Sequence, residues 1–245
     1  MPDPRLAGLR RIAVVPAFNE SESIASVVRE VKAFDPEFEV VVVDDGSTDG
    51  TAQLAVEVGA HVVRLPFNLG IGGAVQTGYQ FARDQGFDLA VQVDGDGQHD
   101  PGQIPLLLEP LLDGRADMAV GTRFAGEGSY RAPLARRLGI GVFARVVSLV
   151  VGQRVTDTTS GFRACNRKAI QLFAADYPHD YPEVEGTILV FKHRLRMVEV
   201  PVAMRARAGG RSSIGTAGSA YYMVKVLLAI FIGLFRRKPT PLEER

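Results

Sequence analysis

Short apolar runs alternate with stretches of helical periodicity over the first two thirds of this 245-residue chain, and this alternation constrains the fold more than any other feature. The apolar runs predict strands at residues 11–15, 40–43, 61–65, 89–93 and 118–120. The helical spacing predicts helices at residues 19–34, 48–58, 71–85 and 101–112. Apolar strands that alternate with helices are typical of a mostly parallel sheet covered on both faces. We therefore expect an α/β fold, in a chain long enough for one large domain with a sizeable core.

Acidic and polar residues cluster where three of the predicted strands end. The three clusters are residues 16–20, 44–49 and 94–96. In a parallel sheet they emerge at the same edge, where open α/β sheets bind ligands. Helix capping by Asn19, Ser47 or Asp49 explains part of this pattern more simply. Capping does not account for adjacent carboxylates at two strand ends, so we expect a binding site at this edge.

The pair Asp94 and Asp96 is the most informative part of these clusters. On an extended backbone, side chains two residues apart point to the same side, and the neighbouring glycines let a bulky ligand approach closely. Two hard oxygen ligands that leave coordination positions open suit Mg²⁺ or Mn²⁺ carrying a substrate diphosphate. For any isolated Asp-x-Asp, an acidic turn at a strand end is the alternative.

Other ligand-binding motifs fail on inspection. Residues 70–75 follow a strand, but Val75 stands where the dinucleotide-binding fingerprint requires Gly or Ala. The chain has no Gly-Lys-Ser/Thr phosphate loop, and His99 stands where a calcium-binding loop requires glycine. The four histidines show no zinc spacing, so surface or supporting roles are expected for most of them. The 28 basic and 28 acidic residues cancel, which gives no indication of nucleic-acid binding.

Two basic apolar segments predict attachment to a membrane surface. Residues 133–151 predict a helix with a basic face and an imperfect apolar face. Residues 220–235 are apolar apart from Lys225, are shorter than the roughly 20 residues of a spanning helix, and precede the basic residues 236–238. This arrangement fits helices lying on an anionic leaflet. The alternatives are a core helix with snorkelling arginines and a buried C-terminal helix.

The compartment can also be predicted from the sequence. Cys165 is the only cysteine, which excludes a disulfide within the chain and favours a reducing compartment. The first eleven residues lack the apolar core of a signal peptide. We therefore expect a peripheral protein on the cytoplasmic face of the cell membrane.

Seven ordered motifs carry a resemblance to a known family; they lie at residues 14–20, 41–51, 68–78, 91–101, 121–124, 157–164 and 199–202. Together they resemble the family 2 inverting glycosyltransferases of GT-A fold, and among them the polyprenyl-phosphate (dolichol-phosphate-type) sugar synthases. The resemblance runs from about residue 11 to residue 214. It implies a GT-A domain at residues 1–213, which includes the helix at 133–151, and an interfacial helix with a basic tail at residues 214–245.

The resemblance also implies roles for individual residues. The implied nucleotide-sugar contacts are Pro16, Phe18, Glu20, Asp45 and Asp94. The implied ligands of Mg²⁺ or Mn²⁺ are Asp94, Asp96 and Gln98. The residues implied to act on the phosphates during transfer are Asp96, Arg123 and Arg207. The implied contacts of the acceptor phosphate are Arg131, Ser148 and Ser212.

The activity implied by the resemblance is inverting, metal-dependent transfer of a sugar from a nucleotide diphosphate to a polyprenyl phosphate. A phosphate acceptor is already largely dianionic at pH 7, whereas a hydroxyl acceptor needs a positioned general base. Family members that glycosylate hydroxyls usually carry a Glu-Asp pair where this chain has Pro-Glu-Val-Glu-Gly at residues 182–186, which favours a phosphate acceptor.

The sequence does not determine which nucleotide sugar is the donor or whether a membrane protein is a partner. A UDP sugar is preferred slightly over GDP-mannose. Since the paired transmembrane helices of many relatives are absent, a small membrane-protein partner could assist attachment. The alternatives to this function are a family 2 transferase with a hydroxyl acceptor and a non-catalytic, nucleotide-sugar-binding membrane scaffold.

Overall fold

The computed structural model describes residues 3–123 and 134–205. The chain divides into two compact units, Met1–Gly210 and Arg211–Arg245, and the second lies outside the described residues. The strands are β1 (Arg11–Ala17), β2 (Phe38–Asp44), β3 (His61–Arg64), β4 (Leu89–Gln92), β5 (Met118–Thr122), β6 (Arg163–Asn166) and β7 (Met197–Pro201). The α-helices are α1 (Ile24–Phe34), α2 (Thr51–Glu57), α3 (Gly70–Asp84), α4 (Ile104–Leu112), α5 (Leu134–Val151), α6 (Arg167–Ala175) and α7 (Pro182–Lys192). Two short 3₁₀ helices are η1 (Pro4–Leu6) and η2 (Pro101–Gln103).

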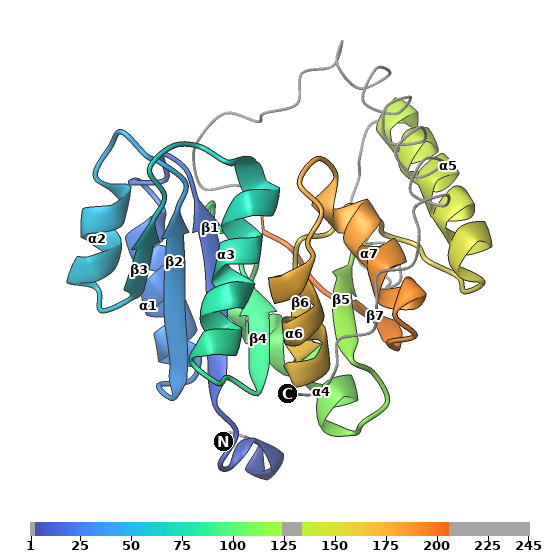
Figure 1. Ribbon diagram of the computed structural model, residues 1–245, viewed down its shortest axis with the longest axis horizontal. Coiled ribbons are helices and arrows are strands. Elements are labelled where there is room, and N and C mark those ends of the chain that lie inside the picture. The colour runs from blue at the N-terminus through green and yellow to red at the C-terminus, as the bar shows by residue number, and fades with distance from the viewer. Residues whose placement is uncertain (1–2, 124–133, 206–245) are drawn as a thin grey trace. The chain divides into compact units, whose positions relative to one another are not determined.

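The seven strands form one sheet in the order β3-β2-β1-β4-β6-β5-β7 (Figure 1). Strand β6 is antiparallel to both of its neighbours, β4 and β5, and the other strand pairs are parallel. The predicted α/β fold with a mostly parallel sheet is therefore confirmed. All five predicted strands are present, and β6 and β7 were not predicted as strands.

Helices cover both faces of the sheet, with α3, α6 and α7 on the near face in Figure 1 and α1 and α4 on the far face. The far-face core joins α1, α4 and the sheet through fully buried aliphatic side chains such as Val28, Leu107 and Val91. On the near face, α3 lies close to β1 because Gly78 has no side chain: a Cβ there would come within 2.2 Å of Val14 Cγ1. Burial of these side chains supplies most of the stability of such a fold.

Two helices begin later than predicted, because polar residues at their predicted starts bond to other loops instead. The helix predicted from residue 19 begins at Ile24, and the helix predicted from residue 48 begins at Thr51. Asn19 has a left-handed backbone (φ 55°), and its side-chain oxygen accepts a hydrogen bond from Thr48 N. The loops after β1 and β2 therefore stay irregular and are bonded to each other.

The end of β4 also differs from the prediction. The strand ends at Gln92, and residues 95–96 form a turn with a bend at Gly97, whose φ is 78°. The prediction that Asp94 and Asp96 share one side of an extended backbone is therefore wrong, because the chain turns between the strand end and Gly97.

Helix α5 is present over Leu134–Val151, close to the predicted range. Among its described side chains, Val147 is buried, Arg145 is exposed, and Leu149 is an apolar side chain with 84% of its surface exposed. Within residues 3–123 and 134–205, no helix combines the length and the apolar character needed to cross a membrane. The helix predicted at residues 220–235 lies outside the described residues.

Candidate active site

The loops that follow β1 and β2 are joined by hydrogen bonds at the carboxyl edge of the sheet. Asn19 N donates to Ser47 Oγ and Thr48 N donates to Asn19 Oδ1, both at 2.9 Å. Glu20 N donates to Thr51 Oγ1 at 2.9 Å. These bonds satisfy backbone N–H groups in the loops that precede α1 and α2. They also fix the loop that contains the predicted nucleotide contacts Phe18 and Glu20, next to Pro16 at the end of β1.

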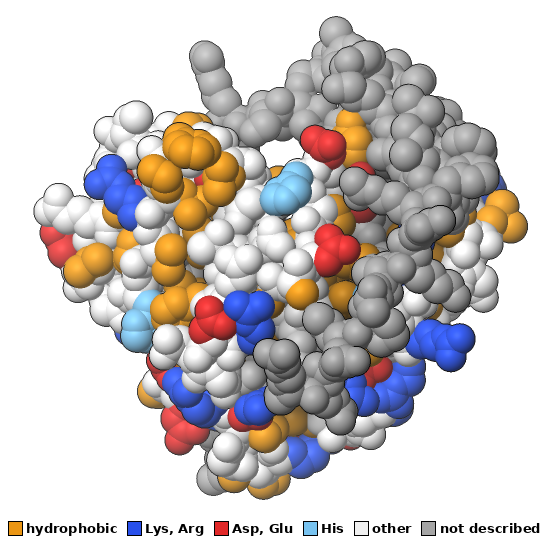
Figure 2. Space-filling view, in the orientation of Figure 1, with side chains coloured by type: hydrophobic (Ala, Val, Ile, Leu, Met, Phe, Trp, Pro, Cys, Tyr) orange, Lys and Arg blue, Asp and Glu red, His pale blue; other side chains and the backbone are white. Residues whose placement is uncertain are grey.

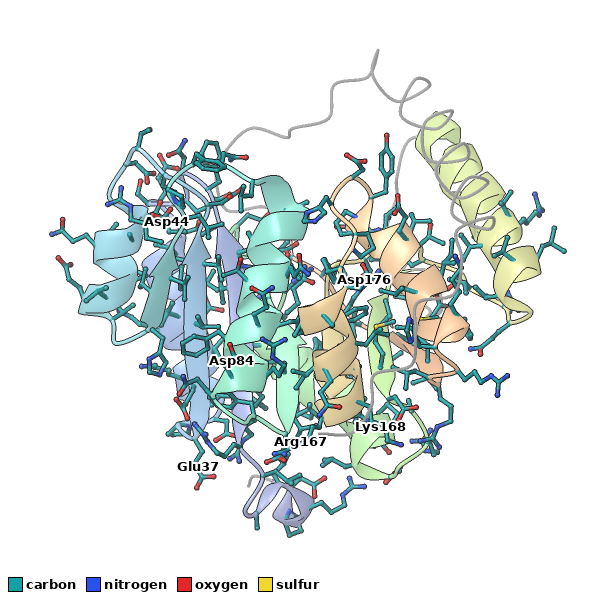
Figure 3. All side chains as sticks on the ribbon, in the orientation of Figure 1. Glu37, Asp44, Asp84, Arg167, Lys168 and Asp176 are labelled. Carbon is teal, nitrogen blue, oxygen red and sulfur yellow. The ribbon has the colours of Figure 1, made fainter. Side chains whose placement is uncertain are left out.

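The two adjacent aspartates at the end of β2 have different surroundings. Asp44 is fully buried at the top of β2 (Figure 3), where it accepts a hydrogen bond from Ser47 N. Asp45 accepts hydrogen bonds from Leu69 N (2.7 Å) and Gly70 N (2.9 Å) at the start of α3. Burial raises the pKa of Asp45 above its ordinary value, although these two N–H groups oppose the rise. Asp45 thus connects β2 to α3 beside the predicted base and ribose site.

Apolar side chains are exposed around this predicted nucleotide site. Phe18, Phe67, Leu69 and Ile71 are all large and exposed, and hydrophobic side chains gather over the loops at the ends of β2 and β3 in Figure 2. A nucleobase has two apolar faces that stack on such side chains. The predicted contact Phe18 therefore lies on a surface whose chemistry fits a base.

The loop between β4 and η2 contains the predicted metal ligands. Asp96 is buried, and its Oδ1 accepts a hydrogen bond from Gln98 N at 3.0 Å. Ser23 Oγ, at the start of α1, donates to Gly95 O at 2.7 Å. A Cβ on Gly95 would lie 3.1 Å from Pro16 O, so glycine permits the close approach of this loop to β1.

Asp94 is contacted by residues on both sides. His99 Nδ1 accepts a hydrogen bond from Asp94 N at 3.0 Å, and His99 Nε2 lies 3.5 Å from Asp94 Oδ2. Gln92 Nε2 lies 3.4 Å from the other carboxylate oxygen, Oδ1. A Cβ on Gly161 would come within 3.3 Å of the same Oδ1. The Asp94 carboxylate is therefore closely surrounded by His99, Gln92 and the backbone at Gly161.

This set of groups fits a divalent ion that the substrate helps to coordinate. Among the described residues, no three His, Cys, Asp or Glu side chains are placed to hold a metal ion by themselves. Asp94, Asp96 and Gln98 offer carboxylate and amide oxygens, which Mg²⁺ and Mn²⁺ prefer. Mg²⁺ is commonly bound by one or two carboxylates together with substrate phosphates. The residues present therefore fit a metal–diphosphate site.

Arg123, at the end of β5, is held by a buried carboxylate. Its Nε and Nη2 donate to Asp157 Oδ2 and Oδ1, both at 2.8 Å, and Nη2 also donates to Thr159 Oγ1 at 2.6 Å. Burial raises the pKa of Asp157, but the hydrogen bonds and charge of Arg123 outweigh it and hold that pKa below its ordinary value. The guanidinium orientation is therefore fixed by a bidentate pair.

Glu199 on β7 holds the backbone of the segment that carries Asp157. Its carboxylate accepts hydrogen bonds from Thr156 N, Thr156 Oγ1 and Asp157 N, with shortest distances of 2.8 Å in each case. Asp157 and Glu199 belong to motifs noted in the sequence, yet no role was predicted for either. Spacing in the sequence could not show that they meet, because β7 reaches this edge only through its pairing with β5.

Arg163, Ser160 and Glu183 form a buried polar cluster whose charges act together with that of Asp94. Arg163 on β6 is 1% exposed; its Nε donates to Ser160 O, and its Nη2 donates to Glu183 O at 2.5 Å. Its Nη1 has no hydrogen-bond partner in the described part of the chain. Burial raises the pKa of the Glu183 carboxyl, the charge of Arg163 opposes the rise, and the charge of Asp94 adds to it. Glu183 stands in the first turn of α7, where the sequence lacks the Glu-Asp pair.

The remaining predicted site residues are placed as follows. Arg131, Arg207 and Ser212 lie outside the described residues. Ser148 Oγ donates to Ala144 O at 2.5 Å and accepts a hydrogen bond from Val155 N at 2.9 Å. Its hydroxyl thus joins α5 to the following loop, and its contact with an acceptor phosphate stays a prediction.

Comparison with known proteins places this geometry in a family. Polyprenol monophosphomannose synthase of Mycolicibacterium smegmatis is 30% identical over 227 residues, covering 89% of this chain and 85% of that protein. Undecaprenyl-phosphate mannosyltransferase of Micrococcus luteus is 31% identical, covering 86% and 91%. UDP-N-acetylglucosamine–dolichyl-phosphate N-acetylglucosaminyltransferase of Methanococcus voltae is 28% identical, covering 77% and 83%.

A solved structure and a family model agree with these relatives. Glucosyl-3-phosphoglycerate synthase of Mycobacterium tuberculosis, in complex with Mn²⁺, UDP-glucose and glycerol 3-phosphate, has a TM-score of 0.69 and 25% identity, covering 92% of this chain and 81% of that one. The model of glycosyl transferase family 2 matches residues 12–173. The predicted family, GT-A fold and enzyme class are thereby confirmed, and the chain belongs to glycosyl transferase family 2.

Proposed function

We propose that this glycosyltransferase transfers a sugar, with inversion, from a nucleotide-diphosphate sugar to a polyprenyl phosphate. The observation that carries the proposal is the placement of Asp94 and Arg123. Strands β4 and β5 are both antiparallel to β6, so both side chains follow strands that end at the same edge of the sheet. A carboxylate pair for a metal–diphosphate and a fixed guanidinium for a phosphate then serve one reaction centre.

The donor would bind across the loops after β1, β2 and β4. Pro16, Phe18, Glu20 and Asp45 would contact the base and ribose. Asp94, Asp96 and Gln98 would hold Mg²⁺ or Mn²⁺ against the diphosphate. The bound ion supplies Lewis-acid stabilisation of the negative charge on the departing nucleotide. The Mn²⁺ and UDP-glucose in the glucosyl-3-phosphoglycerate synthase complex support this part of the proposal.

The acceptor side is expected to work without a general base. A phosphomonoester is largely dianionic at pH 7, so its oxygen can attack the sugar without first losing a proton. The protein then has to orient the acceptor and offset its repulsion from the donor. Arg123 would supply a fixed contact, with Arg131, Arg207, Ser148 and Ser212 as further predicted contacts. Displacement in a single step, from the side opposite the nucleotide, would invert the configuration of the sugar.

A hydroxyl acceptor is the second candidate, and one observation favours it. Glu183 stands in the first turn of α7, and burial raises the pKa of its carboxyl. A carboxylate with a raised pKa is the kind of group that accepts a proton from a hydroxyl. In that case Glu183 would be the candidate general base.

The acceptor class also determines where the enzyme works. A polyprenyl chain stays in the bilayer, because each buried CH₂ contributes about 0.8 kcal/mol. The names of the three relatives contain polyprenol, undecaprenyl phosphate and dolichyl phosphate. We therefore propose peripheral attachment to the cytoplasmic face, through α5 and the segment at residues 214–245, with a small membrane protein as a candidate partner.

The donor sugar is best found by a direct assay. Radiolabelled GDP-mannose, UDP-glucose and UDP-N-acetylglucosamine would be offered with polyprenyl phosphate in detergent, with Mg²⁺, Mn²⁺ or EDTA. We expect metal-dependent label in the organic phase from one donor and its loss in Asp96→Ala, with Asp113→Ala on the exposed surface as control. Label that stays in the aqueous phase would support the hydroxyl acceptor instead. Full transfer by Asp96→Ala would refute the metal assignment.

A further inference from the structure

His99 lies in the loop between β4 and η2, directly after the predicted metal ligand Gln98, and is fixed by its surroundings. Its side chain is 3% exposed, and the imidazole stacks on the buried ring of Phe162, with centroids 4.6 Å apart and an angle of 14° between the planes. The backbone of His99 forms a bridge with Met204. The ring therefore has little freedom to turn, so the positions of its two nitrogens are determined.

Both ring nitrogens lie against the same residue. Asp94 N donates a hydrogen bond to His99 Nδ1 at 3.0 Å, so Nδ1 carries a lone pair and the proton of the neutral ring is on Nε2. Nε2 lies 3.5 Å from Asp94 Oδ2. The protonated nitrogen thus lies beside the carboxylate, slightly beyond the usual length of a hydrogen bond.

We propose that His99 is a positioning residue that orients the Asp94 carboxylate toward the metal and the diphosphate. The inference rests on the proposed role of Asp94 in metal binding. Gln92 also restricts the movement of the Asp94 carboxylate, because its Nε2 lies 3.4 Å from the other oxygen, Oδ1. Groups that orient a metal-ligating carboxylate typically affect metal affinity about 10–100-fold when they are removed.

Two amide variants separate this role from a purely structural one. In His99→Gln, the amide nitrogen reaches the place of Nε2 and can donate to Asp94 Oδ2. In His99→Asn, the amide oxygen reaches the place of Nδ1 and can accept from Asp94 N, but no donor reaches the carboxylate. If His99 positions the carboxylate, a variant must keep a donor to Asp94 Oδ2. If His99 only supports the backbone, a variant must keep an acceptor for Asp94 N.

The readout is the affinity for Mn²⁺ in the presence of UDP or GDP, measured by electron paramagnetic resonance without acceptor. Thermal unfolding of each variant gives its stability. We expect His99→Asn to bind Mn²⁺ about 10-fold or more weakly than wild type, and His99→Gln to retain most of the affinity. His61→Gln, at an exposed site on β3, is the matched control. Nitrogen-15 shifts of His99 should show the proton on Nε2.

The outcomes distinguish failure of this inference from failure of the proposed function. If Asp96→Ala loses Mn²⁺ while both His99 variants bind as tightly as wild type, His99 has no positioning role. If His99→Asn binds Mn²⁺ better than His99→Gln, the hydrogen bond to Asp94 N matters instead, and the inference is overturned. If Asp94→Asn and Asp96→Ala both bind Mn²⁺ like wild type, the proposed metal site itself is wrong.

Discussion

The buried ion pair between Arg123 and Asp157 gives the most quantitative prediction. The Asp157 side chain is fully buried, that of Arg123 is 14% exposed, and two hydrogen bonds of 2.8 Å join them. Asp157→Asn keeps the shape of the side chain but removes its charge. Whichever way the amide is oriented, its NH₂ group faces an N–H group of Arg123, so one hydrogen bond becomes a contact between two donors.

The expected loss of stability follows from the burial of the pair. Removing one partner of a buried ion pair costs about 3–5 kcal/mol, because the other charge is left without compensation. For a chain of this length, 1 kcal/mol shifts Tm by about 2–4 °C, so Asp157→Asn should lower Tm by roughly 6–20 °C. The matched control is Asp84→Asn, since the Arg83–Asp84 pair is 41% and 60% exposed. An exposed pair of this kind contributes less than about 1 kcal/mol.

Urea unfolding at pH 7 measures both variants, with Tm as an independent check. The reasoning also predicts that Arg123→Met in the Asp157→Asn background recovers part of the lost stability, because the uncompensated charge is removed. A loss below about 1 kcal/mol for Asp157→Asn, equal to that of Asp84→Asn, would refute the argument. So would a double variant less stable than the sum of the two single changes predicts.

Three further predictions follow from single contacts. Gly161→Ala should raise the donor KM with little change in Tm, because the new Cβ would lie 3.0 Å from Gln92 Nε2 and 3.3 Å from Asp94 Oδ1 and would displace both side chains. Gly78→Ala should lower the free energy of unfolding by about 1–3 kcal/mol in urea titrations, because its Cβ would lie 2.2 Å from the buried Val14 Cγ1. Because the pKa of Asp157 is lowered in the folded state, its stabilising contribution is complete above the ordinary value of 3.8 and is lost as the pH falls below it. Urea midpoints between pH 5 and pH 2.5 should show this loss in wild type and a smaller one in Asp157→Asn.

These predictions have simple controls. Gly141→Ala, in α5, would place its Cβ within 4 Å of no atom of the described residues and should stabilise the protein by up to about 1 kcal/mol, since alanine favours a helix. A destabilised Gly141→Ala would show that helix glycines are constrained here for another reason. Unchanged stability of Gly78→Ala would show that α3 can move away from β1 at little cost.

The sequence predicted the parallel part of the sheet well, because β1, β2, β4 and β5 are apolar runs. Strand β6 was not predicted, because its residues Arg163-Ala-Cys-Asn166 contain no apolar run and begin with a buried charge. Its place in the sheet depends on pairing with β4 and β5. Periodicity within a segment does not contain that information.

The site was predicted in the same uneven way. Carboxylates at strand ends predicted a site formed by the loop after β4 and the end of β2; the structure brings both to one edge of the sheet, and their roles stay predictions. No role was predicted for Asp157 or Glu199, and His99 was covered only by the general expectation of surface or supporting roles for the histidines, since the contacts of all three are made in the folded chain. For His99 the only signal was its position five residues after Asp94.

The charges of the described site favour a metal-dependent reaction over one that relies on Arg123 alone. Arg123 is paired with Asp157, so this pair adds little net positive charge, and Arg163 is buried. Asp94 and Asp96 add negative charge at the place where the donor diphosphate would bind. Two phosphate-bearing substrates would therefore be repelled unless a divalent ion offsets the carboxylates and the diphosphate. Under the proposed function, the fixed arginine would then orient the acceptor while the ion offsets the charge of the donor.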